Sequence, residues 1–296
     1  INVELRKPED KEKVFLNAYL NQNGRSEVNA VLNHKVNKNW YSGLFIHASA
    51  RPLKFDMNKD GFLDNPLGNQ IGIINRWQYN NPKGYEGQFG VRFLYEDKQG
   101  GQFNFDPKNR ANSPYYGVGI NTRRYEAWSK TGYVFKEKKY QSIGLQLNGS
   151  KHTQNSYLGN TIYDADQESF YSNLIFQSII NNTMHKYRVG ASFMYDKYRE
   201  TFDSLNFNRV ETVPGIFAEY TYDNLEKMTI VGGIRADYHN IFGFFVTPRL
   251  HARFALNKNT IFRISAGRGQ RTANIFADNM GHFISNRLPI IRSTSA

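Results

Sequence analysis

Apolar and polar residues alternate along most of this chain. In one segment, Leu250, Ala252 and Phe254 alternate with Arg249 and His251. Successive side chains on a β-strand point to opposite faces, so this period of two predicts strands with one apolar and one polar face. A helical period is nowhere sustained. The same alternation recurs in residues 139–152, 185–196 and 228–239.

The predicted strands are long, and their polar faces carry charge near mid-strand. They run for roughly 10–14 residues, where strands of globular proteins average about 5–6. Arg235 and Asp237 share the polar face of one of them. No apolar run approaches the 18 or so residues of a membrane helix, but a spanning strand needs only about 9–11 residues with every second one apolar. The pattern therefore predicts an all-β, antiparallel transmembrane β-barrel with a wet lumen.

Short and long connections alternate between these strands. Asn, Asp and Gly, which tolerate left-handed conformations, mark the short ones. In outer-membrane barrels the periplasmic turns are short and the extracellular loops are long. We therefore expect short periplasmic turns at 80–84, 136–138, 181–183, 223–225 and 257–259, and long extracellular loops at 50–69, 98–121, 153–165 and 198–209.

The strand count predicts an unfinished barrel. The first strand, at 12–21, runs outward, and about 13 strands are expected before Gly267, after which the chain should be loop. Single-chain bacterial barrels usually close with an even number of strands. Ile1 begins in mid-strand without a signal peptide. We therefore expect more protein upstream, with residues 7–11 on the periplasmic side.

Composition narrows the classes of function. The net charge is +12, but the Lys and Arg residues are scattered, so we expect no nucleic-acid partner. Because Cys is absent, the chain has neither disulfides nor thiolate metal sites. Aromatic residues make up 15%, and several tyrosines lie near predicted strand ends, where a ring with a hydroxyl suits the membrane interface. The aromatic girdle is predicted at Tyr79, Tyr95, Tyr133, Tyr187, Tyr195, Tyr220 and Tyr238.

Two stretches resemble a known receptor family. Residues 247–250, Thr-Pro-Arg-Leu, head one strand, and a second strand at 260–269 runs into the sequence Gln-Arg-Thr-Ala-Asn-Ile-Phe-Ala-Asp-Asn at 270–279. This pattern resembles TonB-dependent outer-membrane receptors in the form seen in the Bacteroidetes. The opening residues 1–5 are similar to the last plug strand of that family. The resemblance covers the chain from end to end and is most specific at 247–279.

The resemblance implies a barrel of about 22 strands filled by an N-terminal plug. Residues 1–11 would be the end of the plug and its linker, and residues 12–296 the N-terminal portion of the barrel. Such receptors import scarce nutrients into bacteria, driven by an inner-membrane TonB complex that pulls on the plug. The expected cargo is a ferric siderophore or similar metal chelate, with cobalamin and haem as alternatives. Outer-membrane lipid is a further expected partner, and a surface lipoprotein an optional one.

Other classes of function remain open at this point. A passive channel or adhesin barrel predicts no plug and conduction without energy input. A barrel lipase or protease needs a nucleophile constellation at the outer rim, and the sequence has no nucleophile elbow, P-loop or paired-carboxylate pattern, so we do not expect an enzyme. A soluble all-β binding module predicts a polar outer face, where this pattern places Ile, Leu, Phe and Tyr.

One loop resembles a calcium site. Asp56, Asn58, Asp60 and Asp64 match the first nine positions of a calcium-binding loop, but position twelve is Leu67, so the bidentate carboxylate is missing. The alternative is an Asx-rich turn on an extracellular loop. No cofactor is required by either interpretation, and a bound calcium would stiffen the loop.

The polar face of the last predicted strands collects charged side chains. A positive lumen wall suits an anionic ligand, and the alternative is that these groups hydrogen-bond to the plug. In the family-like stretch, Arg268, Arg271 and Asn274 either order the loop, which we favour, or contact the substrate. The predicted lumen residues are Arg235, Asp237, His239, Arg249, His251, Arg253 and Arg263.

Overall fold

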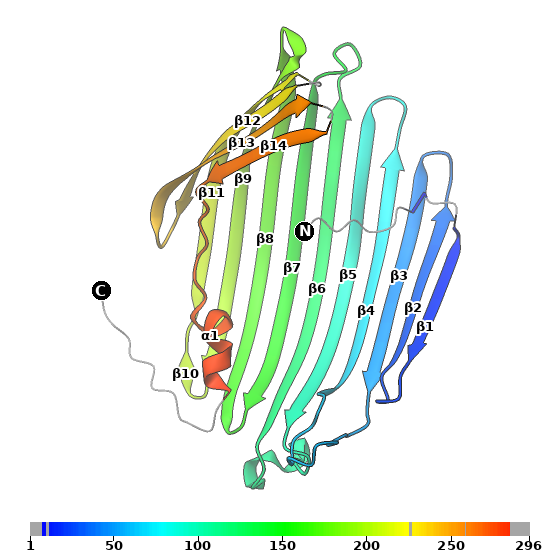
Figure 1. The fold of residues 1–296 in the computed structure, drawn as a ribbon, viewed down its shortest axis with the longest axis vertical. Coiled ribbons are helices and arrows are strands. Elements are labelled where there is room, and N and C mark those ends of the chain that lie inside the picture. Colours follow the sequence, from blue (N-terminus) through cyan, green and yellow to red (C-terminus); the bar gives the residue numbers. More distant parts are fainter. Residues whose placement is uncertain (1–7, 10–11, 225–226, 258, 285–296) are drawn as a thin grey trace.

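The protein folds into one curved antiparallel sheet, shown in Figure 1. The computed structural model describes residues 8–9, 12–224, 227–257 and 259–284. Strands pair in chain order from β1 to β14, and the short β10 pairs with β9 beside this path. The all-β, antiparallel prediction is therefore confirmed. The first seven strands are β1 (Val14–Leu20), β2 (Ser26–Lys35), β3 (Trp40–Arg51), β4 (Leu67–Asn80), β5 (Tyr85–Gly101), β6 (Gly117–Val134) and β7 (Ser142–Leu158).

The second half of the sheet contains the longest strands. β8 and β9 have 20 and 21 residues, well beyond the predicted length. The remaining strands are β8 (Thr161–Ile180), β9 (Asn182–Phe202), β10 (Leu205–Asn206), β11 (Arg209–Asn224), β12 (Met228–His239), β13 (Gly243–Asn257) and β14 (Thr260–Gly267).

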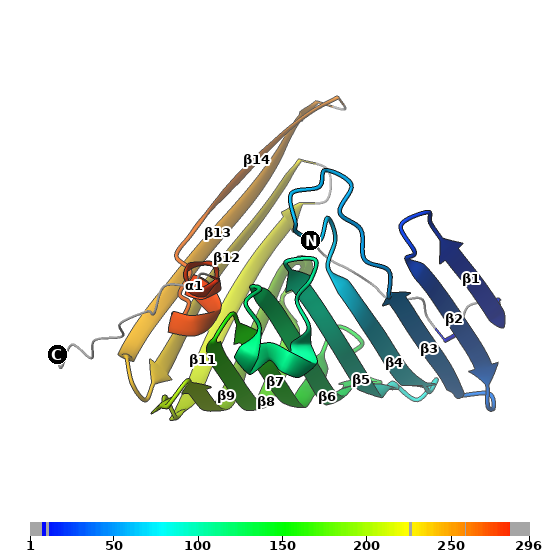
Figure 2. The same ribbon diagram turned by 90° about the horizontal axis from the view of Figure 1, so that it is seen from below.

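The sheet bends into an open trough, as Figure 2 shows from below. Its two edges are β1, which pairs with β2, and β14, which pairs with β13. The described strands therefore form a continuous stretch of barrel wall that does not close on itself. A concave face looks into the trough, and a convex face looks outward.

The strand register separates polar from apolar side chains, as the alternation predicts. On β12, the convex Ile234 and Tyr238 are each 55% exposed, whereas the concave Asp237 and His239 are 4% and 1% exposed. In an antiparallel pair, directly opposed residues share a face, so the parity of β12 propagates across the whole sheet. The convex face is the apolar one, and exposure of its Ile, Leu, Phe and Tyr side chains is expected if lipid covers it.

All seven predicted girdle tyrosines lie on the convex face by this register. Near the short turns they are joined by Trp40, Trp77 and Phe89, whose rings lie within 6.4 Å of one another. Such a cluster suits the membrane–water interface, where amphipathic rings meet headgroups.

The short turns follow the predicted positions, but two of the long loops do not exist. Residues 153–165 and 198–209 were expected to be loops, and β7 instead continues to Leu158, β8 starts at Thr161, and β9 continues to Phe202. These outer extensions are mostly polar on the convex face and mix apolar with polar side chains on the concave face, so they lack the alternation that reveals a strand. The remaining long connections narrow to 52–66 and 102–116, the second holding a short 3-10 helix at Pro107–Asn112.

The segment after Gly267 is not all loop either. It contains helix α1 (Ile275–Phe283), which begins at Asn274 because that side chain accepts hydrogen bonds from the backbone N–H groups of Phe276 and Ala277. Figures 1 and 2 show α1 folded back inside the trough, near the outer ends of β9 and β11. The helix was missed because it is short.

Candidate lumen site

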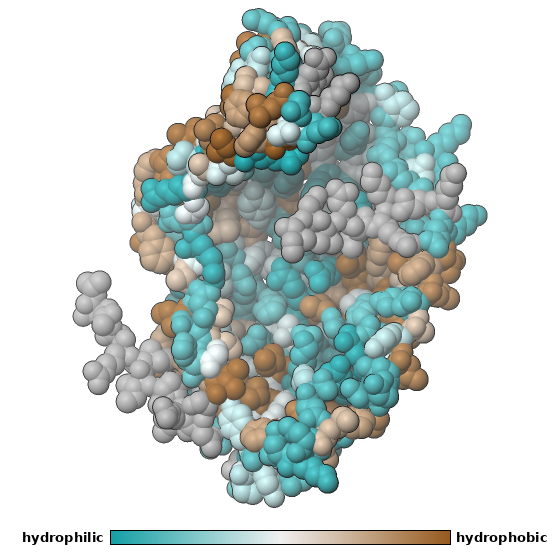
Figure 3. All heavy atoms as spheres, viewed as in Figure 1, coloured by the Kyte–Doolittle hydropathy of each residue, from teal (hydrophilic) through white to brown (hydrophobic). Residues whose placement is uncertain are grey.

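The seven predicted lumen residues share the concave face. Arg235, Asp237 and His239 alternate along β12, and the β12–β13 register places Arg249, His251 and Arg253 on the same face. The β13–β14 register sets Arg263 directly opposite Arg253. Figure 3, which looks into the trough, shows hydrophilic residues over much of its visible floor, with some hydrophobic residues among them. The register therefore places all seven on one face of the sheet, and their role in ligand binding stays a prediction.

Two of these residues line a pocket of about 430 Å³ on the wall formed by β8 to β13, which we call the arginine pocket. Its charged lining consists of Arg188, Arg235, Arg249, Arg268 and Glu219. It therefore unites Arg235 and Arg249 with Arg268 of the family-like stretch, although these three come from different parts of the sequence. The remaining lining includes Asn173, Ile175, Phe217 and Thr247.

The guanidinium groups are held in place by specific partners. Glu219 accepts from Arg188 at 3.3 Å and also from Arg249. Arg235 donates through Nε to Asp237 Oδ2 at 2.7 Å and through Nη2 to the Ser192 hydroxyl at 2.6 Å. Charge-assisted bonds of this kind fix the planar fork of an Arg side chain.

Close approach within the pocket depends on a small residue at its centre. Gly233 lies opposite Arg249 in the register, and a Cβ at Gly233 would stand 2.9 Å from Arg249 Nε. A larger residue would therefore push the Arg249 side chain away from Glu219. Four guanidinium groups face the carboxylates of Glu219 and Asp237, so the pocket keeps a net positive charge and suits an anion.

The other predicted lumen residues lie outside this pocket. His239 is buried, with Nδ1 accepting from the backbone N–H of Ile241 at 3.1 Å and Nε2 facing Glu211 at 3.3 Å. His251 pairs with the Ser265 hydroxyl at 2.9 Å. These contacts position side chains and leave little free hydrogen-bonding capacity on His239.

A buried charge network lies at the outer end of the trough, and sequence reasoning missed it. Arg209 pairs with Glu200 and, through Nε at 2.8 Å, with Glu211. The Tyr163 hydroxyl donates to Glu200 Oε1 at 2.7 Å. Tyr163, Glu200 and Arg209 all fall in the segments taken for loops, so their shared face was not visible in the sequence.

Helix α1 covers this network. Phe276, which is 2% exposed, packs against Tyr163, Phe202 and Phe207 with ring centroids 5.0–5.4 Å apart. Two residues of the family-like stretch order this helix. Asn274 caps its start, and Arg271 pairs with Asp278. The three residues proposed from the resemblance thus divide into two that order the loop and one, Arg268, that lines the pocket.

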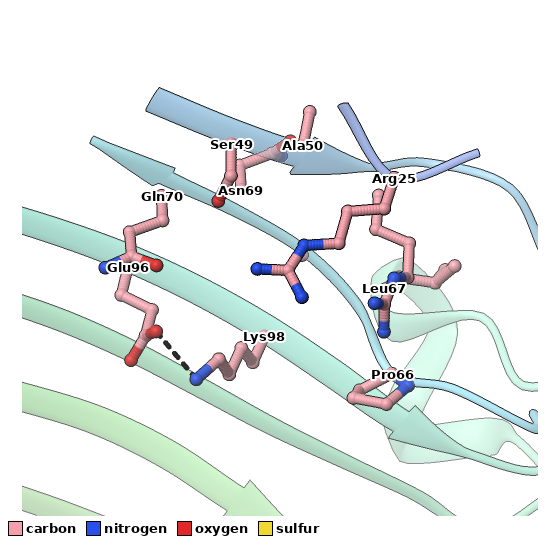
Figure 4. A pocket seen from close by; sticks show the side chains of 11 residues that line it. Arg25, Ser49, Ala50, Pro66, Leu67, Asn69, Gln70, Glu96 and Lys98 are labelled. Carbon is pink, nitrogen blue, oxygen red and sulfur yellow. Dashed lines mark ion pairs between the residues drawn. The ribbon is translucent and has the colours of Figure 1, made fainter. Parts of the chain in front are cut away.

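A second polar pocket, of about 190 Å³, lies at the opposite side of the outer rim and was also missed. Figure 4 shows Arg25 and Lys98 pointing into it, and Arg51 lines it as well. Lys98 pairs with Glu96 at 2.6 Å, and Arg25 pairs with Glu27. Three cations from three strand ends meet here, which no local pattern in the sequence reveals.

The Asp-rich loop uses its carboxylates to hold its own backbone. Asp56 accepts from the N–H groups of Asp60 and Gly61 at 3.1 and 3.0 Å, and Asp64 accepts from that of Met57 at 2.8 Å. Over the described residues, no three His, Cys, Asp or Glu side chains are grouped as in a metal site. Calcium binding stays a prediction, and titration of the protein with calcium tests it.

Comparisons with known proteins point in one direction. The family described as TonB dependent receptor-like, beta-barrel matches residues 14–292. A search of curated protein sequences finds no match. No helix in the described part of the chain is long and apolar enough to cross a membrane.

Solved structures resemble the fold at low sequence identity. A mutant of the ferric enterobactin receptor from Pseudomonas aeruginosa superposes with a TM-score of 0.68 at 10% identity, covering 89% of this chain and 44% of that one. The siderophore receptor PirA from Acinetobacter baumannii gives 0.64 at 11% identity, covering 88% and 41%. The alcaligin outer-membrane receptor from Bordetella pertussis gives 0.62 at 9% identity, covering 82% and 41%. The chain spans less than half the length of each of these proteins.

Proposed function

Because the chain belongs to the TonB-dependent receptor-like β-barrel family, and hence to the bacterial outer membrane, we propose that the whole protein imports an anionic metal chelate. Ferric siderophores are the leading class. The observation that carries the choice of an anionic cargo is the arginine pocket, where four guanidinium groups face two carboxylates on the lumen wall. The similar structures from Pseudomonas and Acinetobacter are named as receptors for ferric enterobactin and for siderophores, which supports the same class.

The proposed mechanism begins with capture of the chelate at the outer mouth. The second polar pocket at the outer rim and the arginine pocket both offer cations to an approaching anion, and the net positive charge of the arginine pocket attracts it. Import would then require a plug that rearranges when TonB pulls on it, with residues 1–11 as the end of that plug. Neither pocket contains a nucleophile–base pair among the residues that line it, and the family is one of transport receptors.

Binding of ferric enterobactin to the full-length protein tests the proposal. Arg249→Gln removes one cation from the pocket while Arg188 still pairs with Glu219, so the wall should keep its structure. We expect roughly tenfold weaker binding, the effect of losing about 1.4 kcal/mol. Arg92→Gln on β5, outside both pockets, is the matched control and should bind as the unmodified protein does.

A transport assay separates import from passive conduction. Cells carrying the protein should accumulate the ferric chelate only while the inner membrane is energised. Accumulation that persists after de-energisation would favour a passive channel, and binding that is unchanged by Arg249→Gln would refute the arginine pocket as the binding site.

A further inference from the structure

The lumen wall carries a further polar pocket near the short turns, which we call the inner pocket. Its volume is about 360 Å³, and it lies on the concave face of β4 to β7. Asn80 and Glu86, which flank the short turn at 81–84, place it at the periplasmic end of these strands. Its floor has no side chains where Gly132 and Gly144 lie directly opposite each other in the β6–β7 register. A Cβ at either glycine would have no neighbour closer than 3.6 Å, so there is room for a ligand above the floor.

The charged side chains that line the inner pocket leave it positive. Arg76 and Lys130 line it together with a single carboxylate, Glu86, and most of the other polar side chains of the lining are neutral amides. Arg76 is buried, whereas Lys130 is exposed. The residues directly opposite Lys130 on β5 and β7 are both glutamines, and among the described residues it has no ion-pair partner. The next carboxylate outward on β6, Glu126, is already paired with Arg124 at 3.1 Å.

The inner pocket adjoins the arginine pocket. Ile175 of β8 lines both of them. One row of directly opposed concave residues also connects the two pockets, since Lys130 and Gln146 of the inner pocket align with Asn173 of the arginine pocket. The arginine pocket includes Arg235 from within β12, whereas the inner pocket reaches the last residue of β4. An anion that leaves the arginine pocket for the periplasm therefore meets the inner pocket next.

A carboxylate from the N-terminal segment lies at the edge of the inner pocket. Glu9 Oε2 accepts a hydrogen bond from Asn80 Nδ2 at 3.2 Å, and Asn80 belongs to the lining. Pro8 is buried, and its Cγ would lie 3.3 Å from a Cβ at Gly43 of β3. The Glu9 carboxylate offsets the positive charge of the pocket while this segment stays in place. Because residues 1–11 are predicted to end the plug, movement of the plug would withdraw Glu9.

We propose that the inner pocket is a second binding site for the anionic chelate on its way to the periplasm, and that Glu9 occupies the edge of this site until the plug moves. The inference rests on the proposed function and adds where the cargo binds after it leaves the arginine pocket. Charged groups that line a confined lumen raise the local concentration of ions of opposite charge. Guanidinium and ammonium groups hold oxyanions through charge-assisted hydrogen bonds. The cargo would therefore replace the carboxylate of Glu9 as the anion beside Arg76 and Lys130.

Import by the full-length protein in energised cells tests the site, with ferric enterobactin as the probe. The double variant Arg76→Gln, Lys130→Gln should import roughly tenfold more slowly at saturating chelate, because the local attraction for the anion is lost. Its equilibrium binding should stay unchanged, since the arginine pocket is intact. Arg76→Lys keeps the charge and should import as the unmodified protein does. Arg92→Gln, on the same face of β5 and outside the inner pocket, is the matched control.

The outcomes separate this inference from the proposed function. An unchanged import rate in the double variant would overturn the inner pocket while leaving the arginine pocket in place. An equal loss in Arg92→Gln would also overturn it, because the general charge of the lumen would then explain the effect. If the unmodified protein neither binds nor imports the probe, the proposed function fails and this inference falls with it.

Cysteine labelling tests whether the inner pocket attracts anions and whether Glu9 opposes them. The chain contains no Cys, so Gln88→Cys introduces a single thiol into the lining. A thiosulfonate reagent that carries a sulfonate group should react faster in energised than in de-energised cells. Glu9→Gln should accelerate this reaction severalfold in de-energised cells, and adding Arg76→Gln and Lys130→Gln should reverse the gain. Equal acceleration of a neutral thiosulfonate by Glu9→Gln would show that the plug has only loosened, and would overturn the role of Glu9.

Discussion

Removing Arg209 should strongly destabilise the outer end of the sheet. Its guanidinium group pairs with Glu200 and Glu211, whose side chains are only 2% and 4% exposed. In Arg209→Met both carboxylates stay buried without their cation. Glu200 keeps the hydroxyl of Tyr163 as a donor, and Glu211 keeps His239.

The magnitude follows from the burial of the two carboxylates. Breaking a buried ion pair by removing one partner costs about 3–5 kcal/mol, because the remaining charge has lost its water and its counter-ion. Arg209 also lies 3.8 Å from the centroid of the Tyr198 ring, a cation–π contact of about 0.5–2 kcal/mol. Its side chain is 26% exposed, so solvent screening lowers the total toward about 3 kcal/mol.

Urea unfolding of the full-length protein in lipid vesicles measures this loss. A second variant, Arg209→Met combined with Glu200→Gln and Glu211→Gln, removes the stranded charges and should recover most of the stability. Arg199→Met is the control, since its partner Glu168 is 40% exposed and the pair is worth little. A loss below about 1 kcal/mol for Arg209→Met, or no recovery in the triple variant, would refute the reasoning.

Three further changes test other parts of the structure. Phe276→Ala should remove about 3–5 kcal/mol of the packing that docks α1, so hydrogen exchange in residues 275–283 should accelerate while β8 and β9 stay protected; unchanged exchange would contradict the packing. Leu145→Lys should cost about 2–4 kcal/mol in vesicles because the side chain faces lipid, whereas Gln146→Lys, one position along and facing the lumen, should cost far less; equal losses would contradict the assignment of faces. Arg235→Gln should destabilise by about 3 kcal/mol because Asp237 is left buried and unpaired, and adding Asp237→Asn should reverse most of that loss.

The sequence predicts the strands well where the two faces of the sheet meet different solvents. On β12 and β13, lipid on one side and water on the other impose a period of two, and both strands were found with the correct faces. At the outer ends of β8 and β9 the concave face mixes Tyr163 and Phe202, which pack under α1, with the charged Glu200, so the alternation disappears although the backbone pairing continues. The alternation is visible in the sequence only where lipid and water lie on opposite faces of a strand.

The sites depend on contacts that only the register reveals. The four arginines of the arginine pocket come from positions between 188 and 268, and their meeting depends on how β9, β11, β12 and β13 align. Helix α1 had a local signal in the cap residue Asn274, but its nine residues are too few to show a helical period. The Bacteroidetes form of the family and the calcium loop stay predictions.

Helix α1 also gives the barrel wall something that the strands alone lack, a brace across its curvature. The chain leaves β14, follows residues 268–274 and seats Phe276 against β8 and β9, so that β11, β12 and β13 lie along the arc between the two attachment points. Because the segment 268–276 links β14 to β8 and β9, it should oppose both flattening and further bending of the sheet between these strands. The spacing of the guanidinium groups on β11, β12 and β13 therefore depends partly on the aromatic contact of Phe276, which lies outside the arginine pocket. A change that releases Phe276 from β8 and β9 should alter the width of the trough at its outer end.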